Sequence, residues 1–239
     1  MITNLFQILE EYNRGLIGVP KSDLDKTACL QDDAIFDHED DKICSLAEKL
    51  TKNQTGDWSK ATVLFNFVRD TIAYDFAPKV DSLRDLSASV ISGKTAGFCH
   101  QKSILLASLL RAIGIPAALT FQTIVDHALL RSRFRDLQNN GTLHFHGLVC
   151  AFLEGDWFRI DATLDSALCN ARGYQITKIT PKQETLLPKT TKNGKQHFTI
   201  TEEKGYFESY PKLLFDLFLK HADGWALWRK FVKKEDISM

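Results

Sequence analysis

The sequence lacks the features that hold a small protein together through covalent or metal links. Its 239 residues include five cysteines, an odd number, and no two of them have the CxxC spacing typical of zinc and redox sites. A disulfide framework, a structural metal site and a bound cofactor are therefore not expected. We expect five reduced thiols, at Cys29, Cys44, Cys99, Cys150 and Cys169.

An excess of charge of either sign is also missing. Lysine and arginine together number 30, and so do aspartate and glutamate. No overall field therefore attracts nucleic acid or an anionic membrane surface. We expect neither of them as a partner.

Long apolar runs are absent as well. No stretch approaches the roughly 18 apolar residues that a membrane-spanning helix needs. Residues 1–18 carry Glu10 and Glu11 within their apolar pattern and have no basic leader, so a signal peptide is not expected. The sequence thus predicts a cytoplasmic protein.

What the chain does contain is the composition of an ordinary globular protein. It is 44% hydrophobic and 25% charged, with 13 glycines and 6 prolines, and its length allows a sizeable buried core. Apolar residues recur at spacings of three and four over 5–12, 43–50 and 57–72, which predicts three amphipathic helices. A shorter helix is expected over 83–91.

The segment around Cys99 is the most informative part of the sequence. Gly97-Phe98-Cys99-His100 leads into residues 101–113, which are apolar on most of a helix's circumference and stop at Gly114 and Pro116. Cys99 is thereby predicted in the first turn of a buried helix. Unsatisfied backbone N–H groups and the positive end of the helix dipole favour a thiolate there.

Three strands are expected after this helix. Residues 117–125, 144–153 and 157–163 have the β-branched and aromatic content of strands, and Glu154-Gly155-Asp156 has the chemistry of a hairpin turn. The basic stretch 126–141 is predicted to form a short surface helix at one wall of a cleft. Further on, a long loop or β-ribbon is expected over 178–195, and one or two helices over 210–232.

The register of this hairpin places two polar residues together. If Leu153 faces Asp156, His146 lies opposite Thr163 and diagonal to Asp161. Diagonal neighbours on one face are about 7 to 8 Å apart at their backbones, within reach of an imidazole and a carboxylate. The sequence therefore predicts a contact between His146 and Asp161.

These residue types suit nucleophilic catalysis. A thiolate at Cys99, an imidazole at His146 and a carboxylate at Asp161 would follow the logic of a catalytic triad with sulfur in place of oxygen. The Cys99 backbone N–H would point at the oxygen of an attacked carbonyl.

The same residues resemble a known superfamily. The run from Gly97 to His100, the apolar helix and Arg111-Ala112-Ile113-Gly114-Ile115-Pro116-Ala117 are similar to the nucleophile segment of transglutaminase-like proteins. His146, the hairpin, Trp157 and Ile160-Asp161-Ala162-Thr163 are similar to the second segment of that family, and Ile72-Ala73-Tyr74 resembles the I-x-Y that often precedes the nucleophile. The resemblance covers residues 64–163.

The resemblance implies a papain-like α+β fold, with a central helix packed on an antiparallel sheet and extra N- and C-terminal helices. We expect a single domain over 1–239. It would consist of an N-terminal helical layer (1–60), a transglutaminase-like catalytic core (61–180), and a surface loop with C-terminal helices (181–239). Cys99, His146 and Asp161 would be the catalytic residues of the family.

The chain departs from the family pattern at three positions. The family commonly has Trp two residues and Glu four residues after the histidine, where this chain has Leu148 and Cys150, and Ala162 replaces the usual Pro. These changes alter the wall of the cleft, so the family's substrate preference cannot be transferred.

Several residues near the triad have alternative interpretations. His144 shares the face of His146 by two-residue alternation and is the main rival for the base. His100 is expected to point away from the thiolate and to help start the helix. Tyr74 is either a phenolic donor to the oxyanion or a core aromatic. A metal site built from Cys99, His144, His146 and Asp161 would use suitable ligand types but matches no zinc spacing.

The function expected from these features is cysteine-dependent acyl transfer on a peptide, protein or small amide. Hydrolysis through a thioester is preferred over crosslinking, because nothing in the sequence points to calcium regulation or to a tailored amine-acceptor site. Two other functions stay open: a non-catalytic module that binds a peptide or partner protein in the old cleft, and acyl transfer from a thioester donor such as coenzyme A. The sequence does not indicate an oligomeric state.

Overall fold

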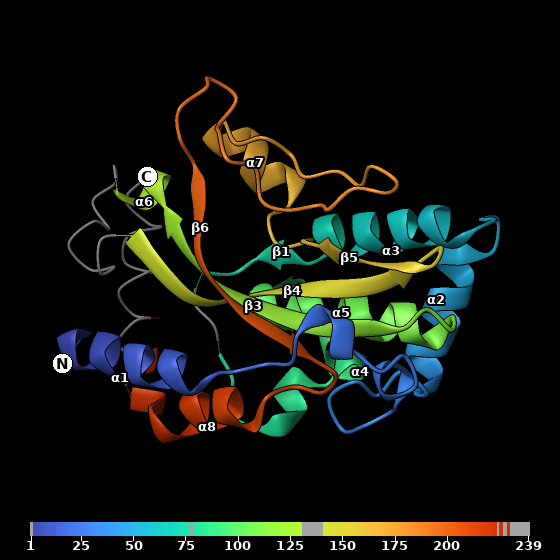
Figure 1. Cartoon of the computed structure of the whole chain (residues 1–239), viewed down its shortest axis with the longest axis horizontal. Helices are drawn as coiled ribbons and strands as arrows, with labels where there is room; N and C mark the ends of the chain where they lie inside the picture. The colour runs from blue at the N-terminus through green and yellow to red at the C-terminus, as the bar shows by residue number, and fades with distance from the viewer. Residues whose placement is uncertain (1, 77–78, 131–140, 224, 227–228, 230–239) are drawn as a thin grey trace.

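The computed structural model describes residues 2–76, 79–130, 141–223, 225–226 and 229 (Figure 1). It has the predicted α+β architecture, in which a central helix packs on an antiparallel sheet. This helix, α5 (Cys99–Ala112), is buried from Cys99 to Arg111. Helices α2 (Asp41–Thr51), α3 (Asp57–Thr71) and α4 (Ala88–Ile91) contact α5, and so do strands β3 (Ala117–Asp126) and β4 (Thr142–Leu153) of the sheet.

The main sheet has four strands in the order β5-β4-β3-β6, and each neighbouring pair is antiparallel. Two short strands form a separate parallel pair just before the central helix. The strands are β1 (Ala73–Tyr74), β2 (Ala96–Gly97), β3 (Ala117–Asp126), β4 (Thr142–Leu153), β5 (Asp156–Ile160) and β6 (Phe198–Phe207).

The other helices surround this core. In Figure 1, α1 and α8 run side by side below the sheet, and α7 lies above it. The helices are α1 (Ile2–Gly15), α2 (Asp41–Thr51), α3 (Asp57–Thr71), α4 (Ala88–Ile91), α6 (His127–Leu130), α7 (Ser166–Arg172) and α8 (Lys212–Lys220), with 3-10 turns at Lys21–Asp23, Ala28–Leu30 and Leu83–Leu86. No helix among the described residues has both the length and the apolar character to cross a membrane.

The helices predicted from apolar spacing are confirmed. Residues 5–12 and 43–50 fall in α1 and α2, 57–71 form α3 with Ile72 directly after it, and 101–113 fall in α5 or directly after it. The segment 83–91 is divided into a 3-10 turn and α4, because Ser87 between them has an extended backbone with φ −72° and ψ 139°.

The hairpin prediction is confirmed in register. Leu153 pairs with Asp156, and the ladder continues to Val149 opposite Ile160. The turn residues Glu154 and Gly155 both have positive φ, 48° and 99°, as a two-residue hairpin turn that follows the strand twist requires. The second strand ends at Ile160, three residues earlier than predicted.

Strand β6 and helix α7 were not predicted. Region 181–239, expected to hold a loop and helices, contributes the edge strand β6 to the main sheet. Its middle residues, Thr201-Glu202-Glu203, are polar and mostly exposed, so the strand has little of the apolar alternation that identifies a half-buried strand. Within the regions predicted to be helical, 126–141 and 210–232, the described residues contain α6, α8 and the helical residues 222–223, 225–226 and 229. Residues 131–140, 224, 227–228 and 230–232 lie outside the described part of the chain.

A β-bulge interrupts β4 at the residue before His146. Gln122 of β3 pairs with His146, but Ile124 pairs with Leu143, so the single residue Thr123 faces two residues on β4. One of these is Phe145, which has a left-handed backbone with φ 59°. An extra residue in one strand reverses the alternation of side chains beyond it. The prediction that His144 and His146 share a face is therefore wrong.

Candidate active site

Cys99 is the first residue of α5, with Phe98 as the N-cap in an extended conformation. Cys99 is 9% exposed. At this position the backbone N–H groups of the first turn have no acceptor within the helix, and the helix dipole is positive. The predicted position of the cysteine in the first turn of a buried helix is thus confirmed.

His146 and Asp161 are in direct contact, as the hairpin register predicts. Nε2 of His146 donates to Oδ2 of Asp161 over 2.6 Å. The other carboxylate oxygen accepts the backbone N–H of Thr163 over 2.9 Å, and the backbone N–H of Asp161 donates to Thr185 O over 2.8 Å. Since both side chains are at least 95% buried, the carboxylate holds the imidazole in one orientation.

The other nitrogen of this imidazole is left for Cys99. Nε2 of His146 is occupied by Asp161, and the ring also hydrogen-bonds the Cys99 thiol, so Nδ1 is the nitrogen that faces sulfur. Burial lowers the pKa of His146, but the Asp161 carboxylate and the Cys99 sulfur outweigh burial and raise the pKa to about 10. The imidazole of His146 therefore lies between the Asp161 carboxylate and the Cys99 sulfur, and its raised pKa favours the protonated ring there.

Tyr74 lies beside the nucleophile through the small parallel sheet. It pairs with Gly97, two residues before Cys99, and its backbone N–H donates to Asp165 Oδ2 over 2.9 Å. Burial, with the nearby charges of Cys99 and Asp161, raises the pKa of its phenol well above the usual value. Tyr74 is therefore a neutral hydrogen-bond donor close to the thiol.

His144 is not part of this arrangement. Because of the bulge, its Nδ1 lies 3.4 Å from Thr123 Oγ1, and Thr123 in turn contacts Asn13 of α1 and Glu202 of β6. The charges that act on His144 are those of Glu10, Lys204 and Glu202, and burial lowers its pKa. The rival base of the sequence analysis is thus directed away from Cys99. The metal site that would use both histidines is not formed, and the described residues contain no other group of metal-ligating side chains.

Both ring nitrogens of His100 have partners other than Cys99. Its ring nitrogens contact Phe145 O at 2.6 Å and the Tyr210 hydroxyl at 2.8 Å. Neither partner was identified from the sequence, because each lies far along the chain.

Lys102 is a further residue that the sequence analysis missed. It is fully buried one turn after Cys99, and Nζ donates to Arg69 O over 2.9 Å and to Ile72 O over 2.5 Å. It thereby ties the end of α3 and the start of β1 to the nucleophile helix. Burial lowers its pKa to about 8 against the opposing effect of nearby carboxylates. The sequence does carry a signal for Lys102, because it is a lysine inside an otherwise apolar helix pattern.

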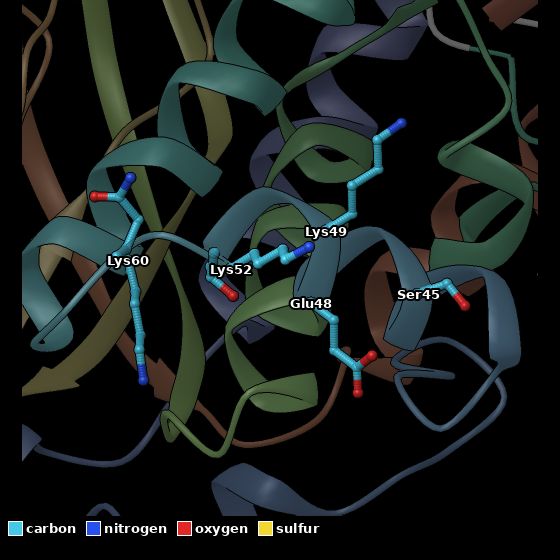
Figure 2. A pocket seen from close by; sticks show the side chains of 7 residues that line it. Ser45, Glu48, Lys49, Lys52 and Lys60 are labelled. Atoms are coloured by element: carbon cyan, nitrogen blue, oxygen red, sulfur yellow. The ribbon is translucent and has the colours of Figure 1, made fainter.

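One hollow in the described part of the chain lies away from these residues. It measures about 730 Å³ and lies between α2 and the beginning of α3 (Figure 2). None of the triad residues lines it; the lining residues are Ser45, Glu48, Lys49, Thr51, Lys52, Gln54 and Lys60.

The raised pKa of His146 predicts a pH dependence of stability. The imidazole titrates near 6.5 when unfolded and near 10 when folded, so its contribution to stability is fully present below pH 6.5 and is lost as the pH rises through about 10. Denaturant unfolding of the wild type should therefore show a free energy that falls over this range. In His146→Gln the free energy of unfolding should fall less steeply with pH. The buried thiols contribute equally to both proteins, so the difference in slope comes from His146. Equal slopes would contradict the prediction.

Comparisons with known proteins address the fold and the family. The model of the transglutaminase-like superfamily matches residues 44–162, about half of the chain, which includes all three triad residues. A comparison with the curated proteins gives no match.

Three solved structures are similar at low sequence identity. A candidate cysteine protease from Cytophaga hutchinsonii is 20% identical with a TM-score of 0.46, over 78% of this chain and 67% of that one. A candidate protease from Parabacteroides distasonis is 16% identical with a TM-score of 0.36, over 58% and 26%. The periplasmic domain of TgpA from Pseudomonas aeruginosa is 21% identical with a TM-score of 0.41, over 59% and 48%. The chain thus spans about half of the TgpA domain and about a quarter of the Parabacteroides protein.

Proposed function

Because this chain belongs to the transglutaminase-like superfamily, we propose that it is a cysteine-dependent enzyme that cleaves an amide bond through a thioester, with Cys99, His146 and Asp161 as its catalytic residues. The observation that supports this most is the position of His146, which hydrogen-bonds Asp161 through one nitrogen and the Cys99 thiol through its ring.

In the proposed first half-reaction, the Cys99 thiolate attacks the carbonyl carbon of the substrate. The new C–S bond forms as the carbonyl π electrons move to oxygen, and the Cys99 backbone N–H stabilises the oxyanion. The phenol of Tyr74 is a second candidate donor. When the oxyanion collapses, the C–N bond breaks and the Nδ1 proton of His146 moves to the leaving amine.

In the second half-reaction, water attacks the thioester. Neutral His146 accepts a proton from that water, the C–S bond breaks, and the carboxylic acid leaves. The thiolate and the imidazolium are thereby restored. Asp161 stays ionised throughout and orients the ring. Water is the acceptor we favour, because no feature of the sequence is typical of calcium regulation or of a dedicated amine site.

Electrophilic peptide probes of varied side chain, followed by peptide mapping, test this proposal. We expect Cys99 to be labelled with a clear preference among side chains. Peptide amides incubated with an excess of a primary amine then separate the acceptors, because mass spectrometry distinguishes the acid from the amine adduct. If the main product is the amine adduct, the reaction is transamidation and not hydrolysis. If the probes leave Cys99 unlabelled, the thioester route is refuted.

A second candidate function is a non-catalytic module that binds a peptide or partner protein. The observation in its favour is that Leu148 and Cys150, where the family commonly has Trp and Glu, are completely buried. The chain has thus lost the Trp and Glu side chains of the family at these positions, and a fold kept without them would suit binding without turnover. The cytoplasmic location stays a prediction.

A further inference from the structure

The residue after the nucleophile is a buried histidine whose ring is held at both nitrogens. His100 is 4% exposed. Its Nε2 lies 2.6 Å from Phe145 O, and its Nδ1 lies 2.8 Å from the Tyr210 hydroxyl. A carbonyl oxygen can only accept, so Nε2 carries the proton and Nδ1 accepts from Tyr210. Burial lowers the pKa of His100 to about 4, which agrees with this neutral tautomer.

The carbonyl that His100 holds belongs to the bulge residue before His146. Phe145 has φ 59°, a left-handed conformation that is unfavourable for a bulky residue. Such a conformation persists only where the surroundings stabilise it. The C=O of Phe145 shares one peptide plane with the N–H of His146. A hydrogen bond that sets the direction of this carbonyl therefore also sets the direction of the His146 backbone.

The residue after His146 is held by the same helix. Ser103 Oγ donates to Gly147 O over 2.9 Å. A Cβ at Gly147 would lie 3.0 Å from Cδ2 of His100 and 3.2 Å from Cε1 of Phe121, so the His100 ring occupies the space of a side chain there. Helix α5, which begins with Cys99, thus contacts β4 on both sides of His146.

From this geometry we propose that His100 is a positioning residue, which aims His146 at Cys99 by holding the Phe145 carbonyl in the β-bulge. The inference rests on the proposed function, because it concerns the base of that reaction. His100 touches neither the sulfur nor the substrate in this account. Its effect passes through the backbone of residues 145–146.

The Tyr210 hydroxyl completes the arrangement from the C-terminal part of the chain. Tyr210 is 7% exposed and lies just before α8. The Tyr210 hydroxyl donates its hydrogen bond to Nδ1 of His100. The ring proton of His100 is therefore on Nε2, which donates to the Phe145 carbonyl. Three aromatic rings also pack against the His100 ring, those of Phe98, Phe121 and Phe218. Among the described residues, the titratable groups that act on the His100 ring include Tyr210 and His146.

Three variants test the inference. His100→Phe keeps the ring among its aromatic neighbours but removes the donor. His100→Gln places an amide N–H near the position of Nε2. Tyr210→Phe removes only the hydroxyl that selects the tautomer. The measurements are kcat and KM on a peptide amide substrate, and the pH profile of Cys99 alkylation by iodoacetamide.

We expect His100→Phe to lower kcat about 100-fold, the loss that a misplacement of about 1 Å can produce, with KM little changed. The alkylation profile should move to higher pH, because a misaimed imidazolium stabilises the thiolate less. His100→Gln should recover most of kcat and the wild-type profile. Tyr210→Phe should lower kcat and move the alkylation profile to higher pH, each by less than His100→Phe does.

A wild-type profile and kcat in His100→Phe would overturn the inference, and so would an equal loss in His100→Phe and His100→Gln without a shift of the profile. If His100→Phe does not fold, Tyr210→Phe decides, and wild-type behaviour there overturns the inference. A different result tests the proposed function itself. That function is refuted if Cys99 of the wild-type protein reacts no faster than the other thiols.

Discussion

Cys99→Ala is expected to lower kcat on an amide substrate by about 10⁴-fold or more. Without sulfur at the start of α5, no group remains that can form the thioester, and the imidazolium of His146 has no thiolate partner. The fold should persist, because alanine is smaller than cysteine and suits the first turn of a helix. The measurement is steady-state hydrolysis of a peptide amide, together with circular dichroism to verify folding.

The matched control for this variant is Cys44→Ala. Cys44 is a half-buried thiol on α2, and burial together with nearby carboxylates raises its pKa. Its replacement should leave kcat unchanged. Cys99→Ala with wild-type biological activity would instead support the non-catalytic binding module, and it would refute the enzymatic proposal.

Asp161→Asn is expected to lower kcat by about 10³- to 10⁴-fold, as loss of the carboxylate does in serine proteases. The amide has nearly the same volume as the buried carboxylate but carries no charge. It can therefore no longer stabilise the imidazolium, and it can accept or donate at Nε2, so the ring tautomer is no longer defined. The pKa of His146, now about 10 with Asp161 as the largest raising influence, should fall.

The control is Asp156→Asn, at the first residue of β5 beside the turn of the same hairpin. The side chain of Asp156 is 69% exposed, and the substitution should change kcat less than twofold, roughly the effect of a surface change. The pH profile of kcat/KM separates the two variants, because only Asp161→Asn should shift its limbs. An Asp161→Asn enzyme with wild-type kcat and an unshifted profile would show that the carboxylate only supports the end of the hairpin through its bond to Thr163.

Much of the candidate site follows from local rules that the sequence makes visible. Cys99 is placed by a helix pattern with clear stop residues, and the contact of His146 with Asp161 follows from a hairpin whose turn defines the register. Both elements depend on residues close together in the chain. Local propensity and pairing rules are therefore sufficient to predict them.

The features that sequence reasoning missed depend on distant contacts. The bulge at Phe145 places a bulky residue in a left-handed conformation, which no local propensity favours. It is accompanied by a hydrogen bond to His100, 45 residues earlier. The bulge also separates His144 from His146, which strict alternation would have kept together. Tyr210 lies 110 residues from the histidine it contacts, and the pattern around it indicates only an apolar helix.

The central claim is that Cys99 is an activated thiolate paired with His146. The most direct test is alkylation of the native protein by limiting iodoacetamide at pH 6, followed by peptide mapping of the five cysteines. The pKa values of Cys29, Cys150 and Cys169 are raised by burial to between about 11 and 12, and that of Cys44 is also raised. We therefore predict that Cys99 reacts first, by a wide margin over the other four. A Cys99 that reacts no faster than those thiols would contradict the claim.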